Sequence, residues 1–395
     1  MHASYYGGIG AAMVLKVSTR GQVAPFQVME VMRAANARAA AGQHILHLEI
    51  GQPGGAAPAP ILEAAKSALL TDRLGYTEAL GLPLLRQKIA TFYADRYGLQ
   101  LPVERIAVVT GSSAGFVLAF LAAFEAGERI ALAAPGYPAY RNILASLGLN
   151  AIEVFSGPAQ RFQPTPELLD QVSGTLDGLI LASPSNPAGT VVDAAAMTAL
   201  IDYCRERGIR LISDEIYHGI VYGNRQTVTA LAYSDDAIVI NSFSKYFCMT
   251  GWRLGWLVVP ENLIRPLECI AQNLYISAPA IAQKAALAAF DCIDELEANV
   301  ARYAANRDLL LRDLPRAGFD RLAPADGAFY LYADVSHLTN DSVAFCGQIL
   351  DQLGIALTPG TDFDTARGHG TMRFSYAGDA TEIAEAAQRL INWRR

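Results

Sequence analysis

The chain has 395 residues, of which 52% are hydrophobic and 17% charged, with 31 Lys and Arg against 38 Asp and Glu. Its length exceeds that of one ordinary domain of roughly 100–200 residues, and its composition excludes intrinsic disorder. The net charge of −7 leaves no positive excess to neutralise nucleic-acid phosphates, and no apolar run approaches the ~20 residues needed to cross a bilayer. We therefore expect a globular protein that binds neither nucleic acid nor membrane.

The N-terminal segment and the cysteines favour a cytoplasmic protein. Residues 1–15 contain no Lys or Arg and so lack the charged start of a secretory signal; we interpret the residues before Met13 as an extension. The five cysteines are an odd number without C-x-x-C spacing. A disulfide framework or a bound metal is therefore not expected.

Short apolar runs alternate with helical patterns through the middle of the chain. Their lack of polar alternation is typical of strands that are buried on both faces. Alternating strands and helices predict an α/β fold with a mainly parallel seven-stranded sheet flanked by helices. The last two runs have no helix between them, which predicts one antiparallel strand at an edge. The runs occupy residues 105–110, 129–135, 150–156, 178–184, 210–216, 237–243 and 255–260.

The pattern changes after about residue 262, where long helical stretches, broken near Asp291, precede short strands. We expect a smaller α+β domain here, which the N-terminal helical segment joins. The predicted organisation is an N-terminal arm with part of the small domain (1–55), a large domain (56–290) and a C-terminal small domain (291–395). Ligands of open parallel sheets bind beyond the carboxyl ends of the strands, so the turns that leave these strands are where chemistry is expected.

The turn after the first strand, GSSAG at 111–115, permits three interpretations. Backbone N–H groups of Ser112, Ser113 and Ala114 would bind a phosphate at a helix N-terminus. Ser113 would alternatively be the nucleophile of a hydrolase elbow, with Asp362 and His369 as its partners. The simplest alternative is a helix N-cap by Ser112 or Ser113.

Other strand ends carry further polar residues. Asp214 lies near the end of the fifth run, with Tyr217 three positions later, and Asn186 lies between two prolines in SPSNPAGT. A P-loop ATPase acid at Asp214 is excluded because the chain contains no G-x-x-x-x-G-K-[ST]. Lys245 follows the sixth run among serines and aromatic residues, with Arg253 eight positions later. Each residue alone is explained by a turn, by packing or by solvation.

Together these segments resemble the class I/II pyridoxal-phosphate (PLP) aminotransferases of fold type I. SFSKYFCMTGWRLGW (242–256) is similar to the lysine signature of that family. The other matching segments follow in the family's order, namely HLEIGQP, GYTEALGLPLLRQKIA, VVTGSSAGF, PGYPAY, SPSNPAGT, SDEIYHG, GAFYLYADV and MRFSYAG. Such an ordered set is far more specific than any single motif.

The resemblance implies roles around the cofactor. Lys245 would form the internal aldimine and shuttle the substrate's α-proton, and Asp214 would face the ring nitrogen. Asn186 and Tyr217 would bind the ring 3′-oxygen, and Tyr137 would lie on the ring. The phosphate would be bound by Ser112, Ser113, Ala114, Ser242 and Arg253.

The resemblance also implies how substrates bind and how chains associate. Arg373 and the backbone of Gly51 would bind the substrate α-carboxylate, with Asn186 beside them. Tyr76 would cross a homodimer interface to the neighbouring phosphate. The implied reaction moves an amino group from an L-amino acid to a 2-oxo acid by a ping-pong mechanism. The alternative is a PLP-dependent C–S lyase or an enzyme like aminocyclopropane-carboxylate synthase, because the same residues serve these reactions.

Overall fold

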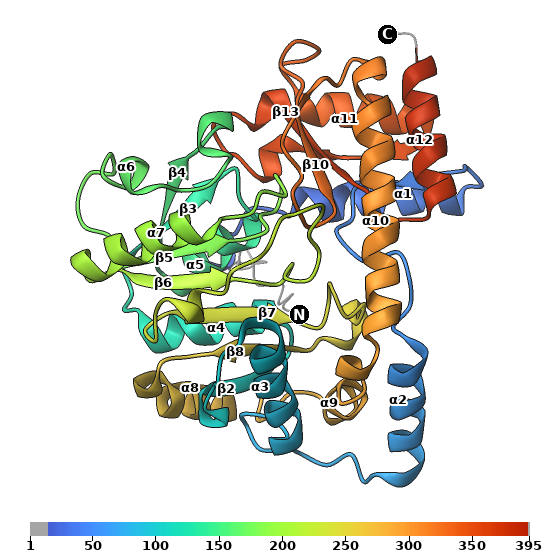
Figure 1. The fold of residues 1–395 in the computed structure, drawn as a ribbon. Helices are drawn as coiled ribbons and strands as arrows, with labels where there is room; N and C mark the ends of the chain where they lie inside the picture. Colours follow the sequence, from blue (N-terminus) through green and yellow to red (C-terminus); the bar gives the residue numbers. More distant parts are fainter. Residues whose placement is uncertain (1–14, 394–395) are drawn as a thin grey trace, which may run out of the picture.

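The computed structural model describes residues 15–393, so the N-terminal extension expected before Met13 lies outside the described residues. A seven-stranded sheet forms its centre (Figure 1), in the order β2-β8-β7-β6-β5-β3-β4. All seven predicted strands are present, which confirms the α/β fold. They are β2 (Ile106–Val109), β3 (Arg129–Ala134), β4 (Asn150–Phe155), β5 (Gly178–Ala182), β6 (Arg210–Asp214), β7 (Ile238–Ser242) and β8 (Gly255–Val258).

The antiparallel strand is β8, but the prediction that it lies at an edge is wrong. β8 pairs antiparallel with β7 on one side and with β2 on the other. Because no crossover helix separates β7 from β8, the chain turns back directly beside β7. The free side of β8 is then covered by β2, which becomes the edge strand.

Helices cover both faces of the sheet because successive strand residues point to opposite faces. Ala107 and Val109 pack with one helical layer, whereas Ile106 and Val108 pack on the other side. Both layers are apolar, which explains why the strands read as unbroken hydrophobic runs. The first layer holds α4 (Ser112–Ala123), α5 (Pro138–Leu147) and α8 (Glu261–Leu274). The second holds α3 (Pro83–Tyr97), α7 (Ala194–Arg207) and α9 (Ala280–Ala286).

A second, antiparallel sheet in the order β12-β13-β10-β9 lies above the first in Figure 1. Its strands are β9 (Arg321–Leu322), β10 (Tyr330–Asp334), β12 (Thr358–Pro359) and β13 (Thr371–Ser375). The helices of this part are α10 (Ile293–Asp313), α11 (Ser342–Leu353) and α12 (Ala380–Asn392).

The N-terminal segment meets this C-terminal part. β1 (Leu46–His47) pairs in parallel with β11 (Ile355–Ala356), and α1 (Gln27–Ala40) precedes it. α2 (Ala59–Thr71) then leads toward the large sheet. The division at 1–55, 56–290 and 291–395 stays a prediction.

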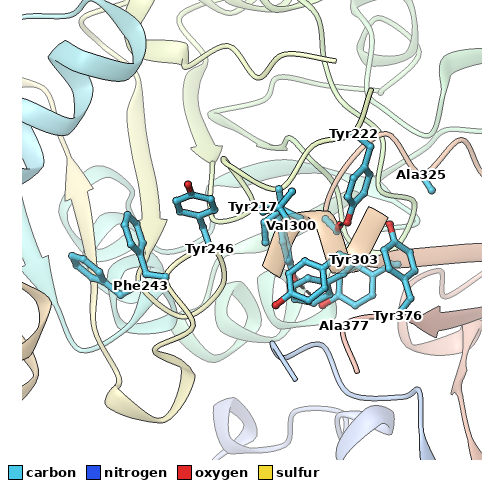
Figure 2. Close-up of a cluster of buried hydrophobic side chains, with 14 of the residues drawn as sticks. Tyr217, Tyr222, Phe243, Tyr246, Val300, Tyr303, Ala325, Tyr376 and Ala377 are labelled. Carbon is cyan, nitrogen blue, oxygen red and sulfur yellow. Dashed lines mark hydrogen bonds between the residues drawn. The ribbon is translucent and has the colours of Figure 1, made fainter. Parts of the chain in front are cut away.

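One apolar core runs between the two sheets. Figure 2 shows it passing from Phe243, at the end of β7, through Tyr217 to Tyr303 of α10 and Tyr376. This packing fixes the loops after β6 and β7 against the second sheet, so side chains from distant segments face one another. No helix in the described part of the chain is both long and apolar enough to span a bilayer.

Candidate active site

A cavity of about 180 Å³ opens at the carboxyl ends of β5, β6 and β7, where open parallel sheets bind ligands. Its wall combines strand ends of the large sheet with residues of the N-terminal segment and of the second sheet. The residues that carry its chemistry are Gly51, Ser112, Ser113, Tyr137, Tyr140, Asn186, Asp214, Tyr217, Lys245, Arg253, Tyr330 and Arg373.

Lys245 lies in the turn after β7 and its amine faces the cavity. Nζ donates a hydrogen bond to the carbonyl of Gly51 at 2.5 Å and lies 5.8 Å from the ring centroid of Tyr217. Desolvation inside the protein, then the charges of Arg373 and Arg253, lower the pKa of Lys245 to about 8. A large share of the amine is therefore neutral near pH 8, the form that a nucleophile or base requires.

Asp214 ends β6 with its carboxylate buried beside the cavity. The Tyr140 hydroxyl donates to Oδ2, and the N–H of Ile216 donates to Oδ1 at 3.2 Å. Burial raises the pKa of Asp214 to about 6, although both hydrogen bonds and the charge of Lys245 oppose the rise. A buried carboxylate of this kind favours a positively charged partner.

Four tyrosines form the walls beside these groups. The hydroxyls of Tyr217 and Tyr330 lie 2.7 Å apart. Tyr137 meets Tyr140 edge to face, with ring centroids 5.3 Å apart. The structure thus brings the predicted Tyr137 and Tyr217 to one cavity, together with two tyrosines to which the sequence assigned no role.

The turn before α4 forms one end of the cavity. α4 starts at Ser112, and its N-cap is Gly111, with φ of 85° and no side-chain cap bond. The serine N-cap interpretation is wrong because Ser112 and Ser113 already lie in the first helical turn, whose N–H groups have no carbonyl partner in the helix. Ser112 and Ser113 line the cavity, whereas Ala114 does not.

Arg253 lies against this turn. A Cβ at Gly111 would lie 2.5 Å from Arg253 Nη2, so glycine is what allows the guanidinium to approach. Arg253 Nη1 donates to the carbonyl of Thr250 at 2.9 Å. The helix N-terminus and the guanidinium together favour an anion here.

Ser242 lies behind the cavity wall. Its hydroxyl donates to the carbonyl of Leu254 at 3.3 Å and accepts the N–H of Ser244 at 3.0 Å. Ser244 and Thr250 line the cavity, but Ser242 does not. A cofactor contact by Ser242 therefore stays a prediction.

Arg373 on β13 forms the opposite end and is only 3% exposed. Nη1 donates to Asn186 Oδ1 at 2.9 Å, and Nη2 donates to the carbonyl of Glu49. Nε has no hydrogen-bond partner within residues 15–393. A Cβ at Gly51 would lie 1.9 Å from the Tyr330 hydroxyl, so the closeness of this segment requires glycine.

Two further predictions depend on residues that do not line the cavity, Tyr76 in one and Asp362 with His369 in the other. Tyr76 is 83% exposed and does not line it, so its role across an interface stays a prediction. The hydrolase alternative is not supported, because Ser113, Asp362 and His369 are not brought together. Asp362 is occupied by the N–H groups of Gln27 and Val28, and neither Asp362 nor His369 lines the cavity.

The cavity also has an apolar wall that sequence reasoning missed. Phe26, Val28 and Met29, at the start of α1, line it with Ile50. The sequence shows α1 as a helix, but nothing in its pattern indicates that its first turn faces a site more than 200 residues away. Tyr140 was missed for a similar reason, since PGYPAY offers two tyrosines without showing which one reaches Asp214.

The donor set fits PLP. The anion-binding turn with Arg253 suits its phosphate, buried Asp214 suits a protonated ring nitrogen, and the amine of Lys245 suits its aldehyde. The unpartnered Nε of Arg373 leaves a guanidinium donor at the far end for a second anion.

Comparisons with known proteins agree with this geometry. The model of the family "Aminotransferase class I and II" matches residues 43–390. Valine–pyruvate aminotransferase of Mycobacterium tuberculosis is 49% identical over 96% of this chain and 99% of its own length. A crystal structure of an aminotransferase from M. tuberculosis is 48% identical, with a TM-score of 0.95 over 96% of this chain and 99% of that one.

Aspartate aminotransferase from Thermus thermophilus, in a structure with maleate, is 28% identical, with a TM-score of 0.89 over 96% of this chain and 99% of that one. The family match covers most of the chain and includes every element that builds the cavity except the start of α1. The chain belongs to the class I and II aminotransferases, a family of PLP-dependent transaminases.

Proposed function

We propose that the enzyme transfers the amino group of an L-amino acid with an apolar side chain to a 2-oxo acid, with Lys245 as the residue that binds the cofactor covalently. The observation that carries this proposal is the Lys245 amine in one cavity with Asp214, Arg253 and Arg373. A lone lysine is normally solvated, whereas this one has a lowered pKa of about 8.

The proposed cofactor contacts follow the geometry. Backbone N–H groups of Ser112 and Ser113 with Arg253 would hold the phosphate, Asp214 the ring nitrogen, and Tyr217 with Asn186 the ring oxygen. Bound PLP supplies an aldehyde and an electron-accepting ring that stabilises negative charge at the substrate's α-carbon. Ala114 and Ser242 do not line the cavity, and their contacts with the cofactor stay predictions.

Lys245 is the proposed acid–base group. Its Nζ is held by the carbonyl of Gly51 at 2.5 Å, and near pH 8 it exists in both protonation states. It can therefore take the proton from the α-carbon and return it. Tyr140 would act through Asp214, because its O–H bond stabilises that carboxylate in its charged form.

Arg373 is the proposed site for the substrate carboxylate, since a guanidinium binds a carboxylate with two parallel hydrogen bonds. The side chain of the substrate would then face Phe26, Val28 and Met29. Within the described residues, the basic side chains of the cavity wall are Lys245, Arg253 and Arg373, and each already has a proposed role. The described part of this chain offers no further cation to a second substrate carboxylate, which favours an apolar donor; the valine–pyruvate activity named for the M. tuberculosis relative supports this substrate class.

A ping-pong cycle in a cytoplasmic homodimer completes the proposal. Tyr76 is 83% exposed on the single chain. Such exposure is expected of a side chain that reaches the phosphate site of the neighbouring chain. We propose that two chains share each active site.

The test is a panel of amino donors mixed with the loaded enzyme without any acceptor. Apolar donors should convert the cofactor's absorbance to that of its amino form in one turnover, and aspartate should not. The Lys245→Ala variant should lose this response, whereas Lys284→Ala should keep it, because Lys284 is paired with Asp72 on the surface at 2.8 Å. Continuous keto-acid release without an acceptor would instead indicate elimination and overturn the proposal.

A further inference from the structure

The apolar wall of the cavity is the first turn of α1. The residue that precedes this turn offers no side-chain acceptor to its free N–H groups. Its N-cap is Phe26, which makes no side-chain cap bond. Phe26 instead meets the ring of Tyr137 edge to face, with centroids 5.8 Å apart. Val28 is buried at 6% exposure, whereas Met29, which also lines the cavity, is 46% exposed.

The missing cap is supplied from the far end of the sequence. The N–H of Gln27 donates to Oδ1 of Asp362 at 3.1 Å, and the N–H of Val28 donates to Oδ2 at 3.2 Å. Asp362 is 2% exposed, and its carbonyl accepts a hydrogen bond from Arg141 at 2.7 Å. A carboxylate that satisfies two free N–H groups at a helix start fixes that helix strongly.

Asp362 is also tied to the substrate-carboxylate end of the cavity. It ends the 3-10 turn Gly360–Asp362, which follows β12, and in β12 Thr358 pairs with Arg373 of β13. The hydroxyl of Thr358 accepts a bond from Arg373 Nη2 at 3.3 Å and donates to the carbonyl of Glu49 at 2.9 Å. The guanidinium therefore lies on β13, and the acid that holds α1 lies in the turn that leaves the neighbouring strand β12.

We propose that Asp362 is a positioning residue that sets side-chain specificity: it fixes the apolar wall at a constant distance from Arg373. This inference rests on the proposed function. When the carboxylate of an amino donor binds Arg373, the side chain of that donor would contact Phe26, Val28 and Met29. Branched apolar donors contact the wall, whereas alanine is too short to depend on it.

Asp364 supplies a matched control two residues away in the same loop. It is also 2% exposed, and it accepts the N–H groups of Ala366 and Arg367 at 3.0 and 2.7 Å. Replacement by alanine thus removes a buried acid with two backbone bonds in either variant, and Asp364→Ala also removes an ion pair with Arg367 at 2.8 Å. Only Asp362 holds α1.

The kinetic experiment measures KM and kcat of the loaded enzyme for L-valine and L-alanine in wild type, Asp362→Ala and Asp364→Ala. Asp362→Ala should raise KM for valine by up to about tenfold, the factor expected if the free energy of the lost helix cap appears entirely in substrate binding, with kcat within twofold. Its KM for alanine should change less than twofold. Asp362→Asn, which keeps one acceptor oxygen, should fall between wild type and Asp362→Ala. Equal changes for both donors, or the same pattern in Asp364→Ala, would overturn the proposal.

Hydrogen exchange of the same proteins gives a readout that does not depend on activity. Amides of residues 27–31 should exchange faster in Asp362→Ala than in wild type, and at the wild-type rate in Asp364→Ala. Unchanged exchange in Asp362→Ala would overturn the positioning role even if the enzyme is active. If wild type accepted no apolar donor, the proposed function would fail while exchange still decided the role of Asp362.

Discussion

Replacing Asp214 by asparagine should stabilise the cofactor-free protein and nearly abolish transamination. Burial raises the pKa of Asp214 from 3.8 to about 6, so the folded chain binds more protons than the unfolded chain between these values. Stability is therefore lost as the pH rises through this window. A shift of about two pKa units corresponds to about 3 kcal/mol. This is the upper limit of the gain in the free energy of unfolding that the uncharged amide gives at pH 8.

The assay is denaturant unfolding of both cofactor-free proteins at pH 8 and at pH 4. Asp214→Asn should be more stable by about 1–3 kcal/mol at pH 8, and the difference should vanish at pH 4. With PLP bound, kcat should fall at least ~100-fold, as expected when a preorganised charge is removed.

Asp313 is a control for which the pKa shift has the opposite sign, because Arg312 lowers its pKa. Asp313→Asn should therefore destabilise the folded protein at pH 8. Equal or lower stability of Asp214→Asn at pH 8 would refute the burial argument.

Three further substitutions test single contacts. Tyr140→Phe removes the hydrogen bond to Asp214 and should raise the pKa of that carboxyl. We expect kcat to fall about tenfold, and the loss of kcat on acidification to begin at a higher pH than in wild type. An unchanged pH profile would contradict this. Arg373→Ala should raise KM for the amino donor about 100-fold, since a charge-assisted pair is lost, and steady-state kinetics measure it. Gly111→Ala places a Cβ 2.5 Å from Arg253 and should weaken PLP binding in an absorbance titration; wild-type affinity would show that this approach is not needed.

The fold was largely predictable because buried strands carry a strong local signal. All seven strands of the large sheet appear as apolar runs, and their spacing by helices indicates parallel pairing. The position of β8 was not predictable, because its neighbour β2 comes from a segment about 150 residues earlier. Pairing between distant segments leaves no mark in local periodicity.

The site was predictable where function imposes a residue type within a short motif. Lys245, Asp214 and Arg373 lie in such motifs, and the structure brings all three to one cavity. The sequence suggests Asp362 only as a member of a hydrolase triad, and its bonds to α1 leave no local signal. The first N–H groups of α1 are bound by a residue more than 300 positions away. The sequence around the start of α1 therefore shows only that a capping residue is missing.

The most direct test of the account is to reduce the loaded enzyme with borohydride and map the labelled peptide by mass spectrometry. The chain has five lysines, at positions 16, 66, 88, 245 and 284. We expect the pyridoxyl group on Lys245 and on none of the other four. A label on another lysine, or no label on a protein that retains PLP, would contradict the central claim.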